Sequence, residues 1–280
     1  MSRRARTTEA PRGPVAGPRV TPFSVVTVAF VAVFLLLVLT LIITDISYTD
    51  AKSLREALTS REVLHALWLS VFTSLTSVAI IVVFAIPVGY ALSRYRFPGH
   101  AVVEALVDLP IVLPPVVIGL SLLVFFSTPI GKWIETTWVE FVYSVQGIIL
   151  CQFIVSASFG IRAAAAAFDS VDRRLENLAL TLGCTRGQAF WRVALPMARN
   201  GIVAGAIVAW AHAVGLFGPL MIFAGTTRMK TEVLPTTVAL ELSIGRIEVA
   251  LAVALVMLAA AAAALVLVHA LAGARRWWPG

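Results

Sequence analysis

Residues 23–44 read FSVVTVAFVAVFLLLVLTLIIT, and this run contains no charged side chain. About twenty consecutive apolar residues in a helix span the hydrocarbon core of a bilayer. A secretory signal peptide has a shorter apolar core followed by a small-residue cleavage site, and neither is seen here. The run therefore predicts a first transmembrane helix.

Five further apolar runs follow along the chain, at about 64–93, 102–126, 145–162, 198–224 and 247–273. Hydrophobic residues make up 59% of the chain and charged residues 13%, which leaves too little polar surface to cover a water-facing body. We therefore expect an all-α integral membrane protein with about six transmembrane helices over residues 23–273. This composition excludes a soluble enzyme.

Lysine and arginine residues are unevenly divided between the two sides of this predicted bundle. Fifteen fall on the side of both termini and seven on the other, out of 22 in the chain. The positive-inside rule then places both termini in the cytoplasm. Residues 1–22 are expected to be a disordered basic tail, 274–280 a short cytoplasmic end, and 163–197 the longest cytoplasmic connection between spans. The net charge of +7 thus reflects topology and gives no reason to expect nucleic acid binding.

The connection at 163–197 has the pattern of two short helices. Its signals are N-caps at Asp169 and Ser170, an apolar face of Leu175, Leu178 and Leu182, a stop at Gly183, a capping box at Thr185–Gln188, and a second helix end at Pro196. Two helices are expected to meet at Gly183. Either a surface hairpin that covers the bundle or a docking element for a partner protein fits this pattern.

Prolines and glycines interrupt two of the apolar runs. Pro110, Pro114 and Pro115 lie in the third run, and Gly215 and Gly218 in the fifth. Irregular backbone at membrane depth is tolerated where it lines a cavity or is buried in protein. These residues therefore indicate either a solute pathway or close helix packing. A G-x-x-x-G pattern at 201–205 predicts tight packing of the fifth helix.

Three ionisable residues fall inside or at the edge of apolar runs. His212 is either a satisfied interior histidine or a pathway residue, and Glu104 and Asp108 are expected to pair with Arg94 or Arg96.

Sequence motifs for catalysis are absent. The stretch 225–231 superficially resembles a Walker A sequence, but Met229 replaces the required glycine and the spacing is one residue short. Cys151 and Cys184 are expected at different depths, so neither a disulfide nor a metal site is expected. A membrane enzyme and a stand-alone secondary transporter or channel are the alternatives, but the chain shows neither clustered catalytic groups nor clear inverted repeats.

The segment 176–183, ENLALTLG, followed by Leu195 and Pro196, resembles the EAA loop of permease subunits in binding-protein-dependent ABC importers. The glutamate position of that loop is held by Asn177, with Glu176 one place early, and the first alanine is Leu178. The stretches RFPG at 96–99, LPIVLPPVV at 109–117, GLFG at 215–218 and AGTTRMKT at 224–231, followed by Leu234 and Pro235, resemble the molybdate/sulfate branch, although Leu216 replaces its usual glutamate.

The resemblance implies a type I ABC importer permease fold and a pathway for a small oxyanion such as molybdate, tungstate or sulfate, with another anion such as thiosulfate as an alternative. The implied partners are a separate ATPase that uses ATP and magnesium, an extracytoplasmic solute-binding protein, and a second permease chain as a homodimer. The chain itself would bind no cofactor and would lie in the lipid bilayer of a prokaryotic cell membrane.

The resemblance also implies site residues. The ATPase-coupling residues would be Glu176, Asn177, Ala179, Gly183, Phe190, Trp191, Leu195 and Pro196. Of these, Asn177, Ala179, Gly183 and Phe190 are expected to make the contact, and anchoring at the membrane interface is the alternative for Phe190 and Trp191. The pathway residues would be Pro114, Pro115, His212, Gly215, Phe217 and Gly218. Outside the membrane, Arg228 and Lys230 would attract an oxyanion, unless they are simply solvated.

Overall fold

The computed structural model describes residues 22–273, so the expected tail and C-terminal end lie outside the described residues except for Pro22. Every regular element in this part of the chain is helical, which confirms the predicted class. The elements, with η marking π-helices, are α1 (Pro22–Tyr48), α2 (Ala51–Thr59), α3 (Arg61–Arg94), α4 (His100–Val112), α5 (Pro115–Ser127), α6 (Pro129–Thr137), α7 (Val145–Asp169), α8 (Arg173–Thr181), α9 (Arg186–Ala189), η1 (Phe190–Ala194), α10 (Leu195–Val214), η2 (Leu220–Ala224), α11 (Leu234–Ser243) and α12 (Ile247–Gly273).

Five helices are long and apolar enough to cross a membrane, and the bent pair α4–α5 makes a sixth candidate span, as predicted. The first of them, α1, belongs to a structural unit of its own that ends at Ser47. It is apolar around its whole circumference, and none of its described residues is buried. A helix of this kind is suited to contact with lipid on every side.

The centre of the larger unit is formed by α3, α7 and α10, which pack along much of their length. Small residues set the distance between α7 and α10. A methyl group at Gly205 of α10 would lie 2.3 Å from the Cβ of Ala163 in α7, and one at Gly201 would lie 2.5 Å from the Cβ of Ala167. This close approach confirms the packing predicted from the G-x-x-x-G pattern, because only a missing side chain lets the two backbones come so near.

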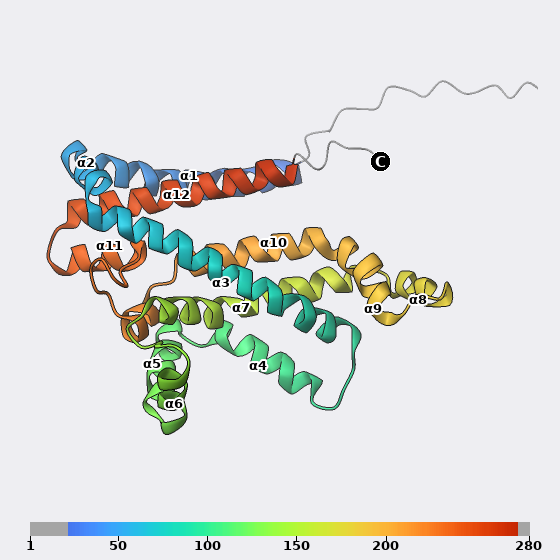
Figure 1. Cartoon of the computed structure of the whole chain (residues 1–280). Coiled ribbons are helices and arrows are strands. Elements are labelled where there is room, and N and C mark those ends of the chain that lie inside the picture. Colours follow the sequence, from blue (N-terminus) through green and yellow to red (C-terminus); the bar gives the residue numbers. More distant parts are fainter. Residues whose placement is uncertain (1–21, 274–280) are drawn as a thin grey trace, which may run out of the picture. The chain divides into compact units, whose positions relative to one another are not determined.

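The third apolar run is broken, as its prolines predicted. Helix α4 ends at Val112, α5 begins at Pro115, and their axes differ in direction by 109°. Proline is favourable at the first position of a helix because its missing N–H would have no partner there. Figure 1 shows α4 beside α7 and α5 turned away from it, followed by the short α6.

The fifth span begins earlier and ends earlier than predicted. One continuous helix runs from Arg186 through η1 and α10 to Val214, so the prediction that Pro196 ends a helix is wrong. The backbone N–H of Leu195 donates to the carbonyl of Phe190, five residues back. This wider turn accommodates a proline, which cannot donate and which clashes with the carbonyl four residues before it in a regular helix. Beyond Gly215 the chain leaves the helix for a loop and η2.

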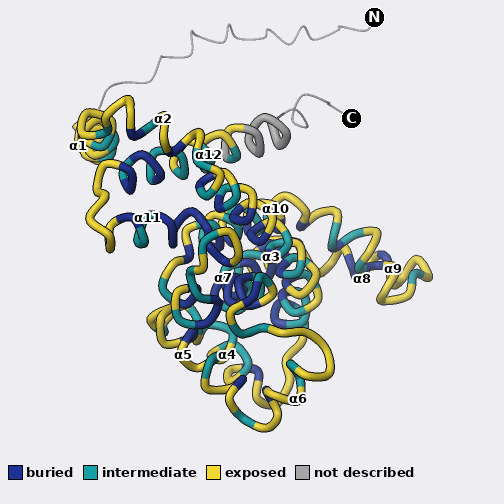
Figure 2. The backbone as a smooth tube through the Cα atoms, turned by 60° about the vertical axis from the view of Figure 1, so that its left-hand side comes forward, coloured by how far each residue is buried: buried dark blue, intermediate teal, exposed yellow. Residues whose placement is uncertain are grey.

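The two ends of the larger unit are built differently. Helices α2 and α11 lie at one end with the start of α12, and α8 and α9 project from the other (Figure 1). Burial is concentrated along α3, α7 and α10 between these ends, whereas α8 and α9 are mostly exposed (Figure 2).

Candidate functional site: the hairpin on α3

The hairpin consists of α8, the turn at Gly183 and α9. Helix α8 begins later than predicted, because α7 continues through Asp169. The carboxylate of Asp169 accepts a hydrogen bond of 2.6 Å from the Ser93 hydroxyl and so ties the ends of α7 and α3 together. Asp172 is the actual N-cap, and its side chain accepts from the backbone N–H of Arg174 at 2.9 Å.

The turn of the hairpin is as predicted. Gly183 has a φ of +91°, in the left-handed region that L side chains rarely adopt. The N–H of Cys184 donates to the carbonyl of Ala179, which closes the end of α8 in the manner of a Schellman motif. Thr185 and Gln188 then form the predicted capping box at the start of α9. The local sequence therefore fixes where the chain reverses.

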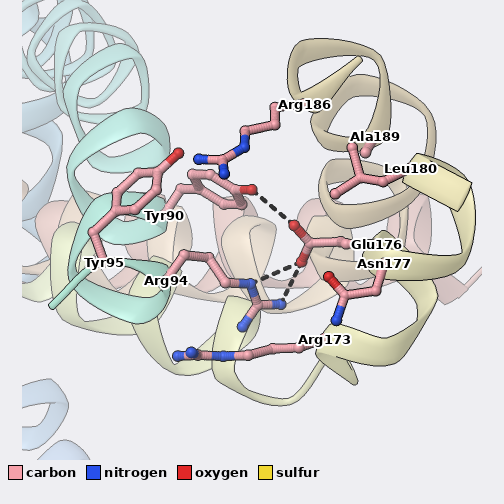
Figure 3. Close-up of a pocket in the computed structure, with 9 residues that line it drawn as sticks. All are labelled: Tyr90, Arg94, Tyr95, Arg173, Glu176, Asn177, Leu180, Arg186 and Ala189. Atoms are coloured by element: carbon pink, nitrogen blue, oxygen red, sulfur yellow. Dashed lines mark hydrogen bonds and ion pairs between the residues drawn. The ribbon is translucent and has the colours of Figure 1, made fainter. Parts of the chain in front are cut away.

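A buried ion pair anchors the hairpin to α3. The Arg94 Nε donates to Glu176 Oε1 at 2.7 Å, and the Tyr90 hydroxyl donates to Oε2 of the same carboxylate at 2.7 Å (Figure 3). The side chains of Arg94 and Glu176 are only 7% and 11% exposed. Arg94 also donates to the carbonyl of Val171 at 3.0 Å. Both oxygens of the Glu176 carboxylate are therefore engaged in hydrogen bonds within the chain.

Aromatic packing supports the same junction. The ring of Phe190 meets the edge of Tyr90 with centroids 4.8 Å apart, and Tyr90 also packs on Phe168 at 5.2 Å. Ala179 is buried. Phe190 and Ala179 thus pack against the body of the protein, and their expected contact with a partner stays a prediction.

Several large apolar side chains of the hairpin and of the following η1 are exposed, beside the exposed polar residues Arg174, Asn177 and Thr181. Leu178 is 59% exposed, Leu182 84% and Trp191 67%. Leu175 lies at the edge of this face and is also exposed. These four residues are called the outer face below. The spacing of the three leucines predicted one apolar helix face, and the structure leaves that face uncovered.

The remaining expected coupling residues differ in how far they are exposed. Asn177 is exposed on α8, and Gly183 is exposed at the turn. Leu195 is half-buried against the core cluster of α3, α7 and α10, and Pro196 is exposed on α10.

The hairpin and α3 together enclose an open pocket of about 300 Å³. Its polar walls are supplied by Tyr90, Arg94, Tyr95, Arg173, Asn177 and Arg186 (Figure 3). Sequence reasoning found Asn177 among these, but it missed the tyrosines and the arginines as a group. A recognisable signal was the density of arginines in 173–199, although their convergence on α3 depends on the fold.

The expected pathway residues come together in part. Gly218 lies against α5, where a methyl group would be 2.5 Å from Val116 Cγ2. Val116 directly follows Pro115, so the break between α4 and α5 meets the loop after α10. Pro114, Pro115, Gly215 and Phe217 are exposed there. The irregular backbone of both runs thus gathers in one region.

His212 lies one turn before Gly215, on α10 against α7. Its Nδ1 is 3.1 Å from the Ser156 hydroxyl, and its ring is 4.5 Å from that of Phe159. These contacts match the interior-histidine alternative. Nearby, the amide of Gln152 donates to the carbonyl of Ala213 at 3.2 Å, and this carbonyl also accepts from the backbone N–H of Leu216 at 3.3 Å.

Glu104 and Asp108 pair with a residue that was not expected. Both carboxylates of α4 face Arg162 of α7, and Asp108 binds its guanidinium through both oxygens. Arg94 is held by Glu176 instead. The predicted partners were therefore wrong, because the path of the chain at 95–99 brings α4 back along α7.

The opposite end of the unit contains a network of ion pairs between α2, α3, α11 and the loop before α11. Arg228 binds Glu62 and also Glu241, the latter at 2.7 Å. Burial by itself would lower the pKa of Arg228, but the carboxylates of Glu62, Glu241 and Glu232 outweigh this effect and raise the pKa. Arg228 is thus neutralised rather than free to attract an anion.

Glu232 is the unusual member of this end. It is 1% exposed, and neither carboxylate oxygen has a hydrogen-bond partner within residues 22–273. The nearby Thr237 hydroxyl donates to the carbonyl of Val233 instead, at 3.1 Å. Burial raises the pKa of Glu232, and the carboxylates of Glu62 and Glu241 add to the shift, whereas the neighbouring Thr237 hydroxyl and Arg228 oppose it.

Known proteins resemble this chain over most of its length. It is 40% identical over 176 residues to the molybdate/tungstate transport system permease protein WtpB of Thermococcus kodakarensis, covering 63% of this chain and 67% of that protein. It is 37% identical to a probable molybdenum ABC transporter permease of Haloferax volcanii, covering 80% and 81%, and 32% identical to the sulfate transport system permease protein CysW of Escherichia coli K12, covering 64% and 62%.

The fold is found in solved structures. A bacterial ABC transporter involved in the import of the acidic polysaccharide alginate aligns over 92% of this chain and 96% of its own, with a TM-score of 0.72 and 17% identity. The same kind of transporter, in complex with an alginate-bound periplasmic protein, aligns with a TM-score of 0.71 over 88% of this chain and 92% of its own, at 18% identity. Residues 81–277 match the family described as binding-protein-dependent transport system inner membrane component. The chain therefore belongs to that family of multi-pass permease subunits.

Proposed function

We propose that this chain forms the membrane pathway of an ATP-driven importer for a small oxyanion, most simply molybdate or tungstate, with sulfate next. The hairpin would dock onto a separate ATPase that binds ATP and magnesium. An extracytoplasmic solute-binding protein would deliver the anion, and a second copy of this chain would complete the pathway. On this proposal both termini and the hairpin face the cytoplasm, as the distribution of arginine and lysine predicts.

The observation that carries the coupling role is the contrast between the two faces of the hairpin. The inner face is held against α3 by the Arg94–Glu176 pair. On the outer face, the side chains of Leu178, Leu182 and Trp191 are exposed. A rigidly held element with an uncovered apolar face can transmit the motion of a docked partner to a membrane helix. An unattached surface loop would not transmit such a motion.

The relatives support the choice of solute. The three relatives named above carry the names of permeases for molybdate and tungstate, for sulfate and, as a probable one, for molybdenum, and molybdate, tungstate and sulfate are all tetrahedral dianions. The region where Pro114 and Pro115 meet Gly215 and Gly218 is the proposed pathway segment, because irregular backbone at membrane depth offers polar groups to a solute.

Docking is tested by copurification of the permease with its ATPase. Leu182→Glu places a charge on the outer face and is expected to weaken ATPase retention more than tenfold, since a buried leucine contributes about 2 kcal/mol. Leu58→Glu, which alters an exposed leucine of α2 at the opposite end, is the matched control. Equal retention of the ATPase in both variants would contradict the docking role.

Transport is tested in proteoliposomes with molybdate, tungstate and sulfate. Uptake of at least one of them should require ATP on the hairpin side and the binding protein on the other side. Uptake without the ATPase would instead identify a stand-alone transporter, and failure of all three anions with a working ATPase would reject the solute class alone.

A further inference from the structure

Three charged residues meet where α4 lies beside α7 (Figure 1). The guanidinium of Arg162 in α7 binds both carboxylate oxygens of Asp108 in α4, and it also donates to the backbone carbonyl of Glu104 at 3.3 Å. Glu104 and Asp108 are four residues apart, so α4 presents both acids on one side. These three residues are called the triad, and their summed formal charge is −1.

The triad lies inside the bundle rather than at its hairpin end. Arg162 precedes the end of α7 at Asp169 by seven residues, which corresponds to about 10 Å along a helix. The next residue, Ala163, faces Gly205, which lies nine residues before the end of α10 at Val214. Charges at such a depth are costly and call for a specific environment.

The larger unit does not enclose the triad. The side chains of Arg162, Asp108 and Glu104 are 35%, 39% and 38% exposed. The carboxylate of Glu104 is also held loosely, because its oxygens lie 3.6 Å from Arg162 Nη1 and 3.6 Å from His100 Nδ1. Both distances are too long for direct hydrogen bonds. Glu104 therefore keeps most of its capacity to accept hydrogen bonds from water.

The exposed face of α3 at the same depth has a different character. Gly160, two residues before the arginine of the triad, lies between Ile81 and Ala85 of α3. At this level the side chain of Val83 is 68% exposed. Residues 63–93 of α3 include no lysine, arginine, aspartate or glutamate. This face is suited to lipid, whereas the face with the triad is not.

We propose that the face of α4 and α7 with the triad lines a water-filled vestibule on the hairpin half of the solute pathway. Charged side chains within a membrane face the bundle interior or a water-filled cavity, and the exposure of the triad leaves the cavity. A dry contact with a second copy would bury the uncompensated charge of −1, which is strongly unfavourable.

The role of the vestibule in transport rests on the proposed function. A wall with a net negative charge repels a dianion, so an oxyanion that reaches the vestibule is released rather than held there. The bidentate contact with Asp108 keeps the guanidinium of Arg162 from acting as a trap for the anion.

The experiment measures which reagents reach a spin label on this face in liposomes. It uses the full chain with Cys184→Ser, because the remaining Cys151 is completely buried, and the unlabelled background is measured on that parent. Glu104→Cys carries the label, since its loss leaves the contact of Arg162 with Asp108 intact. Val83→Cys is the matched control at a similar depth.

Collision of the label with a water-soluble nickel chelate and with oxygen, which concentrates in lipid, is then compared. The ratio of nickel to oxygen collisions should be several-fold higher at position 104 than at position 83. Ile111→Cys leaves the triad intact on the next turn of α4, and its side chain is 44% exposed. This variant decides in the same way if Glu104→Cys does not elute as a folded chain in gel filtration.

Two outcomes would overturn the vestibule. Oxygen access at position 104 equal to that at position 83 would place the face in lipid. Low access of both reagents would place it against another chain. Neither measurement requires transport, so absence of the vestibule in a chain that still takes up an oxyanion with its ATPase rejects this inference alone. A hydrated face in a chain that shows no ATP-driven uptake would reject the proposed function instead.

Discussion

The guanidinium of Arg94 and the carboxylate of Glu176 lie 2.7 Å apart and are almost completely buried, although 82 residues separate them in the sequence. This pair joins the last turn of α3 to the first turns of α8. The position of the hairpin is therefore tied to that of α3 through a short, polar contact.

Breaking this pair should loosen the hairpin. Removal of one partner of a buried pair costs about 3–5 kcal/mol, because the other charge is left uncompensated. We expect Glu176→Gln to raise amide hydrogen exchange in residues 173–185 and to reduce ATP-dependent uptake. Glu140→Gln, which changes an exposed carboxylate elsewhere, should leave both unchanged. Exchange rates equal to the wild type in Glu176→Gln would show that the pair is not an anchor.

The turn of the hairpin should depend on the left-handed backbone conformation of Gly183 rather than on the room available for a side chain at that position. A methyl group at Gly183 would meet nothing within 4 Å, but its φ of +91° disfavours a β-branched residue. Gly183→Val should cost about 1–2 kcal/mol and impair coupling, whereas Gly183→Asn, which tolerates this region, should be milder. Gly187→Ala is the control, because that glycine has open space and an ordinary φ. Equal uptake in all three variants would contradict this explanation.

The packing of α10 against α7 should depend on the absence of a side chain at Gly205. A methyl group at Gly205 would lie 2.3 Å from Ala163 Cβ, so Gly205→Ala should destabilise the bundle by about 1–3 kcal/mol. The double variant Gly205→Ala/Ala163→Gly removes the opposing methyl and should recover most of the thermal unfolding temperature in detergent. No recovery in the double variant would mean that the two helices do not pack at this point.

Stability should depend on pH through Glu232. Because burial raises its pKa above the ordinary value of 4.5, the folded protein holds this proton more tightly than the unfolded chain does. The free energy of unfolding contributed by this group is therefore greatest at low pH and decreases as pH rises above about 4.5. Arg228, Glu62 and Glu241 are the charged groups that face it.

Glu232→Gln mimics the protonated acid and should remove this part of the pH dependence. Thermal unfolding measured from about pH 5 to about pH 8 should then be flatter in the variant, while Glu140→Gln should follow the wild type. Identical slopes in the wild type and Glu232→Gln would show that the carboxylate is hydrated rather than buried.

Several features follow from the sequence alone, because they depend on composition or on neighbouring residues. The apolar runs predict the membrane spans, since a segment inside a bilayer must have its backbone hydrogen bonds complete and a continuous apolar helix completes its own. Gly183 and the Thr185–Gln188 capping box fix the turn of the hairpin, because these contacts lie within a few residues. The prolines at 114 and 115 predict the break before α5 for the same reason.

Other features were decided only by the tertiary structure. The sequence does not reveal that Glu176 faces Arg94, that Phe190 turns inward onto Tyr90, or that the helix continues past Pro196. Each depends on how one helix is rotated and placed against another that is distant in the chain. A helix repeats every 3.6 residues whatever it packs against, so its pattern defines a face but not the partner of that face. The packing of α3, α7 and α10 selects the partners, and with them the side of the hairpin that stays uncovered.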